Sequence, residues 1–219
     1  TTLRRHGFLS TKLRQRPYVV TYAMAENSPA GGSRDLRAVG VSAAFLRDFA
    51  TKVRTLGDTP TTKDVCDLII VPETKERKCA LVDLLGGKTD DTGRALLGRP
   101  TVFISHAWRY TFETPLSVML DYAKDHPDAY FWFDLFVNNQ NIAADLPQEW
   151  WTTTFRTQIE SIGKVVLVLS PWNDPVPLKR AWCLYEILCS LQGSGVEFLV
   201  KLPPEQVGAF HQGLLESFE

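Results

Sequence analysis

The sequence predicts an α/β protein, in which a parallel sheet carries helices on both faces and a small helical unit precedes it. Two patterns support this prediction. From Pro100 onward, short continuous apolar runs alternate with helical patterns, as strands buried on both faces require. Between residues 41 and 98, apolar residues recur at the spacing of short helices. With 219 residues, 44% of them hydrophobic, the chain is long enough to bury a sizeable core.

The first 98 residues divide into two segments. Residues 1–40 are basic at first and then small and polar, which is typical of an extended arm with a flexible link. Residues 41–98 form the helical unit. Three short helices alone offer little core, so we expect the apolar face of the first one to pack on the domain that follows. That face consists of Phe45, Phe49 and Val53.

Caps and breakers mark the three expected helices of this unit. Ser42 caps the first helix and Gly57 ends it. The second begins at Thr62 and stops at Pro72. We expect Thr74 to cap the third, which Gly86 and Gly87 then stop.

Residues 99–219 form the α/β domain. The expected strands are 101–105, 129–134, 164–170 and 196–200, and the expected helices are 114–124, 150–162, 178–191 and 203–218. We expect the first strand to lie in the centre of the sheet, as in flavodoxin-like order. A fifth strand is not evident before Glu219, so we expect either a domain trimmed at its C-terminus or a chain cut from a longer protein.

The helix over 178–191 carries two distinct stripes. Its apolar residues recur at i, i+3, i+4 and i+7: Leu184, Ile187, Leu188 and Leu191. This stripe is predicted to lie on the core. Trp182 and Glu186, four residues apart, share a stripe on roughly the opposite side. A neighbouring segment, a partner or a ligand is expected to cover the indole there.

Polar and indole side chains gather where the expected strands end. In a parallel sheet, ligands bind beyond the carboxyl ends of the strands, near the switch in strand order. The candidate binding residues at these ends are Ser105, His106, Trp108, Asp134, Ser170 and Trp172.

Composition narrows the class of function. The net charge is -1, which gives the whole chain no electrostatic footprint for nucleic acid or a membrane surface. Residues 1–99 carry 17 Lys and Arg against 11 Asp and Glu, and residues 100–219 carry 7 against 14, so the halves stand at +6 and -7. That asymmetry suits docking of the two parts, pairing of copies or simply solvated faces.

Cysteine and histidine usage points to a reduced, metal-free protein. The four cysteines form no C-x-x-C pair, and the four histidines are scattered without metal-ligand spacing. We expect buried, reduced thiols in a soluble cytoplasmic protein.

Four blocks in the right order resemble Toll/interleukin receptor (TIR) domains. They are residues 102–107 (VFISHA), the strand ending in Phe133 and Asp134, residues 165–170 (VVLVLS) and residues 181–186 (AWCLYE). The last block is similar to plant-type members, and its Trp-x-x-x-Glu spacing to bacterial ones. Residues 105–108 (SHAW), together with the helical run over 61–85 that precedes their strand, also resemble protist and algal proteins with TIR-like domains. One departure is residues 135–141 (LFVNNQN), which lack the glycine of the usual loop.

The resemblance implies two kinds of function. Some TIR domains consume NAD as a substrate, without another cofactor, and cleave the nicotinamide–ribose bond to give ADP-ribose or a cyclic product. Glu186 would then be the catalytic carboxylate, and Trp182 or Trp108 could stack on a flat ring. Other TIR domains are interaction modules without chemistry, which self-associate in multidomain signalling proteins. Glu186 as an ordinary exposed helix carboxylate remains the simplest alternative to a catalytic role.

Overall fold

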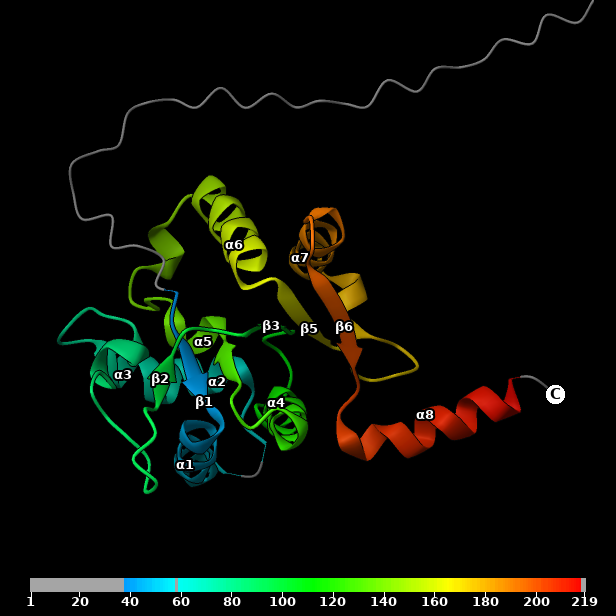
Figure 1. Cartoon of the computed structure of the whole chain (residues 1–219), viewed down its shortest axis with the longest axis horizontal. Helices are drawn as coiled ribbons and strands as arrows, with labels where there is room; N and C mark the ends of the chain where they lie inside the picture. The colour runs from blue at the N-terminus through cyan, green and yellow to red at the C-terminus, as the bar shows by residue number, and fades with distance from the viewer. Residues whose placement is uncertain (1–37, 58, 218–219) are drawn as a thin grey trace, which may run out of the picture. The chain divides into compact units, whose positions relative to one another are not determined.

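The computed structural model describes residues 38–57 and 59–217 (Figure 1). The described residues all belong to one compact unit. The expected boundary at residue 98 therefore falls inside one compact unit. The predicted arm over residues 1–40 lies almost entirely outside the described residues.

The unit is α/β, as predicted. Its strands are β1 (Gly40–Ser42), β2 (Leu97–Gly98), β3 (Val102–Ser105), β4 (Tyr130–Trp132), β5 (Lys164–Val168) and β6 (Glu197–Lys201). Its α-helices are α1 (Ala43–Val53), α2 (Thr62–Val65), α3 (Val71–Thr74), α4 (Glu113–Asp125), α5 (Asp134–Val137), α6 (Gln148–Ile162), α7 (Ala181–Gln192) and α8 (Pro204–Glu216). A π-helical turn at Cys66–Ile70 joins α2 to α3, and short 3-10 turns lie at Arg54–Leu56, Leu81–Leu84, Ala143–Asp145 and Val176–Lys179.

The six strands form one sheet in the order β2-β1-β4-β3-β5-β6. The four strands β4, β3, β5 and β6 are parallel, and β3 lies between β4 and β5. This confirms the flavodoxin-like order with a central first strand. β1 and β2 extend the sheet beyond β4 in antiparallel pairing, which the sequence patterns did not predict.

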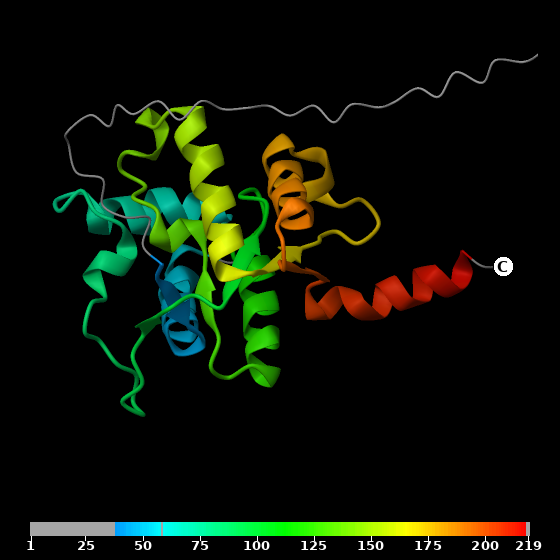
Figure 2. The same ribbon diagram turned by 45° about the horizontal axis from the view of Figure 1, so that its top comes forward.

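Helices cover both faces of the sheet, and successive residues of the strands point to opposite sides. Phe103 of β3 packs with Phe155 and Ile159 of α6 on one face, while its neighbours Val102 and Ile104 join the larger core on the other. Figures 1 and 2 show α6 and α7 together on the first side, and α1 and α4 on the second. Burial on both faces explains why the strands read as continuous apolar runs.

Helix α1 shares its core with the sheet, as predicted. The Ser42 hydroxyl caps it by accepting a hydrogen bond from the Phe45 amide. Phe49 then contacts the rings of Phe112 at 5.8 Å and Phe136 at 5.0 Å, both beyond residue 98. Helix α1 is therefore part of the same folded body as the sheet.

The expected second and third helices differ from the structure. Pro72 does not stop the second helix, because it sits in the first turn of α3, where its missing N–H costs little. Thr74 ends that helix instead of capping the next one, and its hydroxyl donates to the Ile70 carbonyl oxygen. The expected third helix is only the 3-10 turn Leu81–Leu84.

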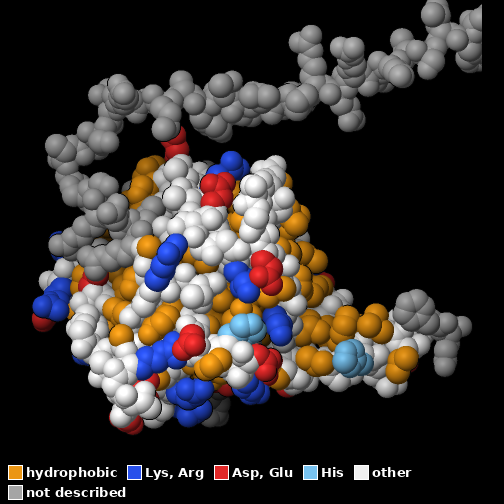
Figure 3. All heavy atoms as spheres, in the orientation of Figure 1, with side chains coloured by type: hydrophobic (Ala, Val, Ile, Leu, Met, Phe, Trp, Pro, Cys, Tyr) orange, Lys and Arg blue, Asp and Glu red, His pale blue; other side chains and the backbone are white. Residues whose placement is uncertain are grey.

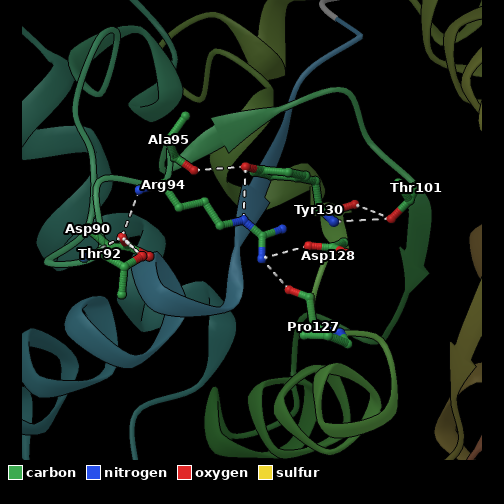
Figure 4. A network of polar contacts seen from close by, with 8 residues as sticks. All are labelled: Asp90, Thr92, Arg94, Ala95, Thr101, Pro127, Asp128 and Tyr130. Atoms are coloured by element: carbon green, nitrogen blue, oxygen red, sulfur yellow. Dashed lines mark hydrogen bonds and ion pairs between the residues drawn. The ribbon is translucent and has the colours of Figure 1, made fainter.

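A polar network fastens the segment before β2 to the sheet (Figure 4). Arg94 Nε donates to the Tyr130 hydroxyl at 3.3 Å, and its guanidinium pairs with Asp128 at 3.3 Å. The Tyr130 hydroxyl in turn donates to the Ala95 carbonyl oxygen at 2.9 Å. Asp90 holds the preceding turn by accepting from the Thr92 and Arg94 amides. The segment that carries β2 is thus tied to β4, the strand that pairs with β1.

Helix α7 lies with the opposite side inward from the one predicted. Its buried residues are Cys183, Glu186, Cys189 and Ser190. The leucines of the predicted core stripe are exposed, Leu184 by 46%, Leu188 by 47% and Leu191 by 69%. The inward side meets the polar end of β3, where a donor is available to Glu186, and its remaining residues are small enough to lie close to the sheet.

Among the described residues, no helix is both long and apolar enough to cross a membrane.

Candidate functional site

Glu186 and Ser105 form the centre of the candidate site. Ser105 is the last residue of β3, the central parallel strand, and its hydroxyl donates to Glu186 Oε2 at 2.5 Å. Glu186 lies halfway along α7 and reaches this strand end because α7 turns its polar side inward. The contact therefore lies at the carboxyl edge of the sheet, where the order switches around β3.

The surroundings of Glu186 favour its protonated form. Burial raises the pKa of Glu186 from 4.5 to about 8, and the charge of Asp134 adds to the increase. The Ser105 hydroxyl, the Trp182 indole and the positive charge of Arg180 act in the opposite direction on this pKa. Desolvation exceeds these favourable contacts, so in this closed arrangement the carboxyl group is largely neutral at neutral pH.

Asp134 brings a second, largely buried carboxyl group to the same edge. It begins α5, directly after β4, and its Oδ2 accepts a hydrogen bond from the Trp108 indole at 2.7 Å. Burial raises the pKa of Asp134 to about 6, although this hydrogen bond lowers it. Gln140 fixes the turn by donating to the Asp134 carbonyl oxygen at 2.8 Å. Two carboxyl groups with raised pKa values thus face the end of β3.

His106 lies next to Asp134 without a hydrogen bond to it. Its Nδ1 is 3.9 Å from Asp134 Oδ1, and burial lowers the pKa of His106 to about 3, so the ring is neutral. Within the described residues, His106 Nε2 and Asp134 Oδ1 are both buried and have no hydrogen-bond partner. Buried polar atoms are rarely left unpaired in a structural core, so these two atoms mark a place able to bind a polar group.

Ser105, His106 and Glu186 are buried, whereas the side chain of Asp134 is 15% exposed. Ser105 is 1%, His106 6% and Glu186 4% exposed.

Trp182 lies beside the cluster, and a neighbouring helix covers it. Its indole packs edge-on against Phe155 of α6, with ring centres 5.0 Å apart, and lies tilted against Tyr185, with ring centres 5.6 Å apart. The expectation that something covers this indole is confirmed, and the covering segment is α6. Much of its ring is therefore already in contact with protein.

Ser170 and Trp172, the remaining two predicted residues, have partners of their own. The Ser170 backbone is fixed at both ends by Tyr110, whose hydroxyl donates to the Ser170 carbonyl oxygen and accepts from its amide. Trp172 contacts Phe210 of α8 at 5.9 Å. Within the described part of the chain, no hydrogen bond or ring contact joins either residue to Glu186. The structure therefore brings together Ser105, His106, Trp108, Asp134, Trp182 and Glu186, and it places the other two at the adjoining loop.

Two residues of the site were not predicted. Arg180 precedes α7, and its positive charge lowers the pKa of Glu186, Asp134 and His106. The Cys183 thiol donates to the His106 carbonyl oxygen at 3.6 Å, one turn before Glu186. Their spacing could have indicated both, because Cys183 lies three residues before Glu186 on the inward side of α7 and Arg180 lies six residues before it. The inward side of α7 was predicted wrongly, so this spacing was not used.

The described residues hold no group of three or more His, Cys, Asp or Glu side chains able to bind a metal ion. All four cysteines are buried and free, as predicted.

No protein-family model, curated protein or solved structure matches this chain. Its function is therefore proposed from the geometry of the cluster and from the sequence blocks that surround it.

Proposed function

We propose that this protein is a TIR-type NAD-consuming enzyme that cleaves the bond between nicotinamide and ribose, with Glu186 as its catalytic carboxylate. The Ser105–Glu186 hydrogen bond at the end of β3 is the observation that carries the proposal. Burying a carboxyl group costs free energy, which an ordinary helix glutamate avoids by facing water. A carboxyl group with a strongly raised pKa, in the ligand-binding region of a parallel sheet, is a candidate for chemistry.

The chemistry suits a carboxylate. When the C1′–N bond breaks, its electron pair goes to the ring nitrogen, and nicotinamide leaves as a neutral molecule. The ribose that remains carries positive charge, which an ionised Glu186 stabilises. Water then adds at C1′ and gives up a proton, so the products are ADP-ribose, nicotinamide and one proton. Capture by the substrate's own adenine would give the cyclic product instead.

The other groups of the cluster have roles in this proposal. The Ser105 hydroxyl orients the Glu186 carboxyl group, and Asp134 with its free Oδ1 accepts a hydrogen bond from a ribose hydroxyl. Arg180 supplies positive charge beside the two carboxyl groups and can hold a phosphate. The protein is expected to act in the cytoplasm, where its free thiols stay reduced.

Nicotinamide release from NAD tests the proposal. Purified protein is incubated with NAD at several protein concentrations, and nicotinamide is measured by chromatography. Glu186→Gln keeps the shape of the side chain but cannot carry the charge, and we expect a loss on the order of 10²–10³ in turnover. Glu160→Gln, on the exposed side of α6, is the matched control and should leave turnover unchanged. A wild-type protein without release at any concentration, or an active Glu186→Gln variant, would sink the assignment.

The exposed side of α7 favours a second candidate, a TIR-like interaction module without chemistry. Leu184, Leu188 and Leu191 present an apolar stripe on an outer helix face, a feature more typical of a binding surface than of a solvated one. This candidate predicts self-association that Leu188→Glu abolishes and Glu186→Gln leaves unchanged. Light scattering of wild type and the two variants tests this association. Association without nicotinamide release in wild type would favour the interaction module over the enzymatic proposal.

A further inference from the structure

Helix α8 holds the loop that follows β5 through one side chain. Gln206 Nε2 donates to the Ser170 hydroxyl at 2.7 Å, and Gln206 Oε1 accepts from the Trp172 amide at 3.0 Å. The indole of Trp172 then lies against Phe210, with ring centres 5.9 Å apart. A single glutamine thus bridges two residues of the loop while the next turn of α8 holds the indole.

Gly213 completes this contact by lacking a side chain. A Cβ atom placed there would lie 2.2 Å from Cη2 of Trp172 and 2.9 Å from Cζ2, so the indole rests on the helix backbone itself. Gly208 of the same helix has nothing within 4 Å of the corresponding position. Glycine weakens the middle of a helix by about 1 kcal/mol relative to alanine. At residue 213, the close packing of Trp172 on the helix backbone offsets this loss of helix stability.

Helix α8 meets the rest of the unit at the loop that carries Ser170 and Trp172 and beside α4. Gln206, Phe210 and Gly213, spaced i, i+4 and i+7, are partly buried, and every other residue of α8 is exposed. The exposed residues include Val207, Leu214 and Leu215, and Figure 3 shows the hydrophobic side chains gathered over this helix. Because α8 has no buried residue, its hold on the body of the protein is weak and easily lost.

The loop that α8 contacts leads directly to the cluster at the end of β3. Residues 171–180 run from Ser170, fixed by Tyr110, to Arg180 at the start of α7. The first turns of α7 then place Cys183 and Glu186 inward, where they are 1% and 4% exposed. Residues 171–180 therefore connect the contact with α8 to the inward side of α7.

We propose that α8 is a latch. When α8 is docked on Trp172, it holds residues 171–180 and the start of α7 in the closed position that buries Glu186. When α8 undocks, these residues can open. The inference concerns access to the site of the proposed function. It rests on that function only for the reason why the site would need to open. Its test measures opening directly and does not depend on NAD chemistry.

Alkylation of Cys183 reports the opening. This thiol is 1% exposed and faces the cluster, and burial raises its pKa to about 12, so the closed form reacts slowly. The full chain is treated with N-ethylmaleimide, and the modified peptides are followed by mass spectrometry. Cys66 and Cys79, in the N-terminal part of the unit, serve as internal references.

Gly213→Ala and Gly208→Ala form a matched pair for this test. Both replace glycine by alanine in α8, but only the first adds an atom that collides with Trp172. We expect Gly213→Ala to label Cys183 roughly tenfold faster than wild type, and Gly208→Ala to label it at the wild-type rate. Gln206→Ala removes both hydrogen bonds without a collision and should also accelerate labelling. Circular dichroism melts establish that each variant is folded.

A double variant shows whether the indole is the contact that matters. Trp172→Leu lacks the ring atoms that Gly213→Ala would strike, so labelling should be fast in Trp172→Leu and no faster in the double variant. Equal labelling of Cys183 in wild type, Gly213→Ala and Gln206→Ala would overturn the latch, as would a further acceleration by Gly213→Ala in the Trp172→Leu background. A protein that opens in this way but releases no nicotinamide would leave the latch standing and remove the enzymatic proposal.

Discussion

Ser105 and Glu186, 81 residues apart in the chain, are joined by a hydrogen bond in which the serine hydroxyl donates to Glu186 Oε2. The bond links the end of the central strand to the inward side of α7, away from solvent. A neutral glutamic acid accepts such a bond through its carbonyl oxygen, and an ionised one accepts it more strongly. The contact therefore serves both protonation states, which gives the site a dependence on pH.

Nicotinamide release is expected to rise with pH. Burial raises the pKa of Glu186 to about 8, so the fraction in the ionised, cation-stabilising form increases as pH approaches that value. Initial rates at saturating NAD across this range provide the measurement. A rate that falls over the same range would show that ionised Glu186 is not the active form.

Glu186→Gln is expected to change how stability depends on pH. Between the ordinary pKa of 4.5 and the raised pKa of about 8, folded wild type holds a proton that the unfolded chain has released. The free energy of unfolding of wild type therefore falls as pH rises, by at most about 1.4 kcal/mol per pH unit. Glutamine binds no proton, so this loss disappears. Thermal melts near the two ends of the window, with Glu160→Gln as control, should show it, and identical pH profiles for both variants would contradict it.

Trp108→Phe is expected to destabilise the fold by about 1–3 kcal/mol, because the buried Asp134 carboxyl group loses the donor 2.7 Å from its Oδ2. The pKa of Asp134 should also increase, since that hydrogen bond lowers it. Urea unfolding at a pH where Asp134 is ionised measures the cost. Trp150→Phe on α6 is the control, and an equal cost in both variants would mean that lost ring packing, not the hydrogen bond, is responsible.

Leu188→Ala and Leu116→Ala test which side of α7 is buried. The same substitution is made in two helices, but Leu188 is 47% exposed and Leu116 is 1% exposed. The first should change the free energy of unfolding by about 0.5 kcal/mol or less. The second should cost about 2–5 kcal/mol, because it leaves a cavity in the core. Comparable costs in denaturant unfolding would restore the leucine stripe to the core.

Phe49→Ala is expected to cost about 3–5 kcal/mol, since it removes a ring that contacts Phe112 and Phe136. The loss should appear as one cooperative transition, seen together by far-ultraviolet and near-ultraviolet circular dichroism. Two separate transitions would mean that residues 41–98 fold independently of the sheet.

The parallel strands were predictable because their apolar runs have one simple cause, burial on both faces. The expected strand 101–105 is β3 (Val102–Ser105), and the expected strand 196–200 is β6 (Glu197–Lys201). β1 and β2 were not predicted, because strands of three and two residues carry no periodicity and, unlike the three-residue β4, they do not lie within a longer aromatic run. The helix end at Pro72 was predicted wrongly for a different reason. A proline that stops a helix and a proline in the first turn of the next helix look alike in sequence.

Six residues of the cluster were named from the sequence, but Arg180, Cys183 and the orientation of α7 were not predicted. Leu184, Leu188 and Leu191 gave the stronger apolar stripe, and hydrophobic periodicity selects the stronger stripe as the buried one. Glu186 is buried because Ser105, from a distant strand, supplies a hydrogen bond, and a pattern confined to one helix cannot register a partner 81 residues away. The closed state of the cluster and the hold of α8 on Trp172 likewise depend on contacts between elements far apart in the chain.

The pairing of β1 with β4 protects an edge of the sheet. Val41 and Ser42 lie opposite Phe131 and Tyr130, so the backbone N–H and C=O groups of β4 on that side are already in use. A fragment beginning at residue 99 would leave those groups free on a short, largely apolar strand. Exposed strand edges of this kind join to other chains, so such a fragment should aggregate through β4 even though it retains every residue of the Glu186 cluster.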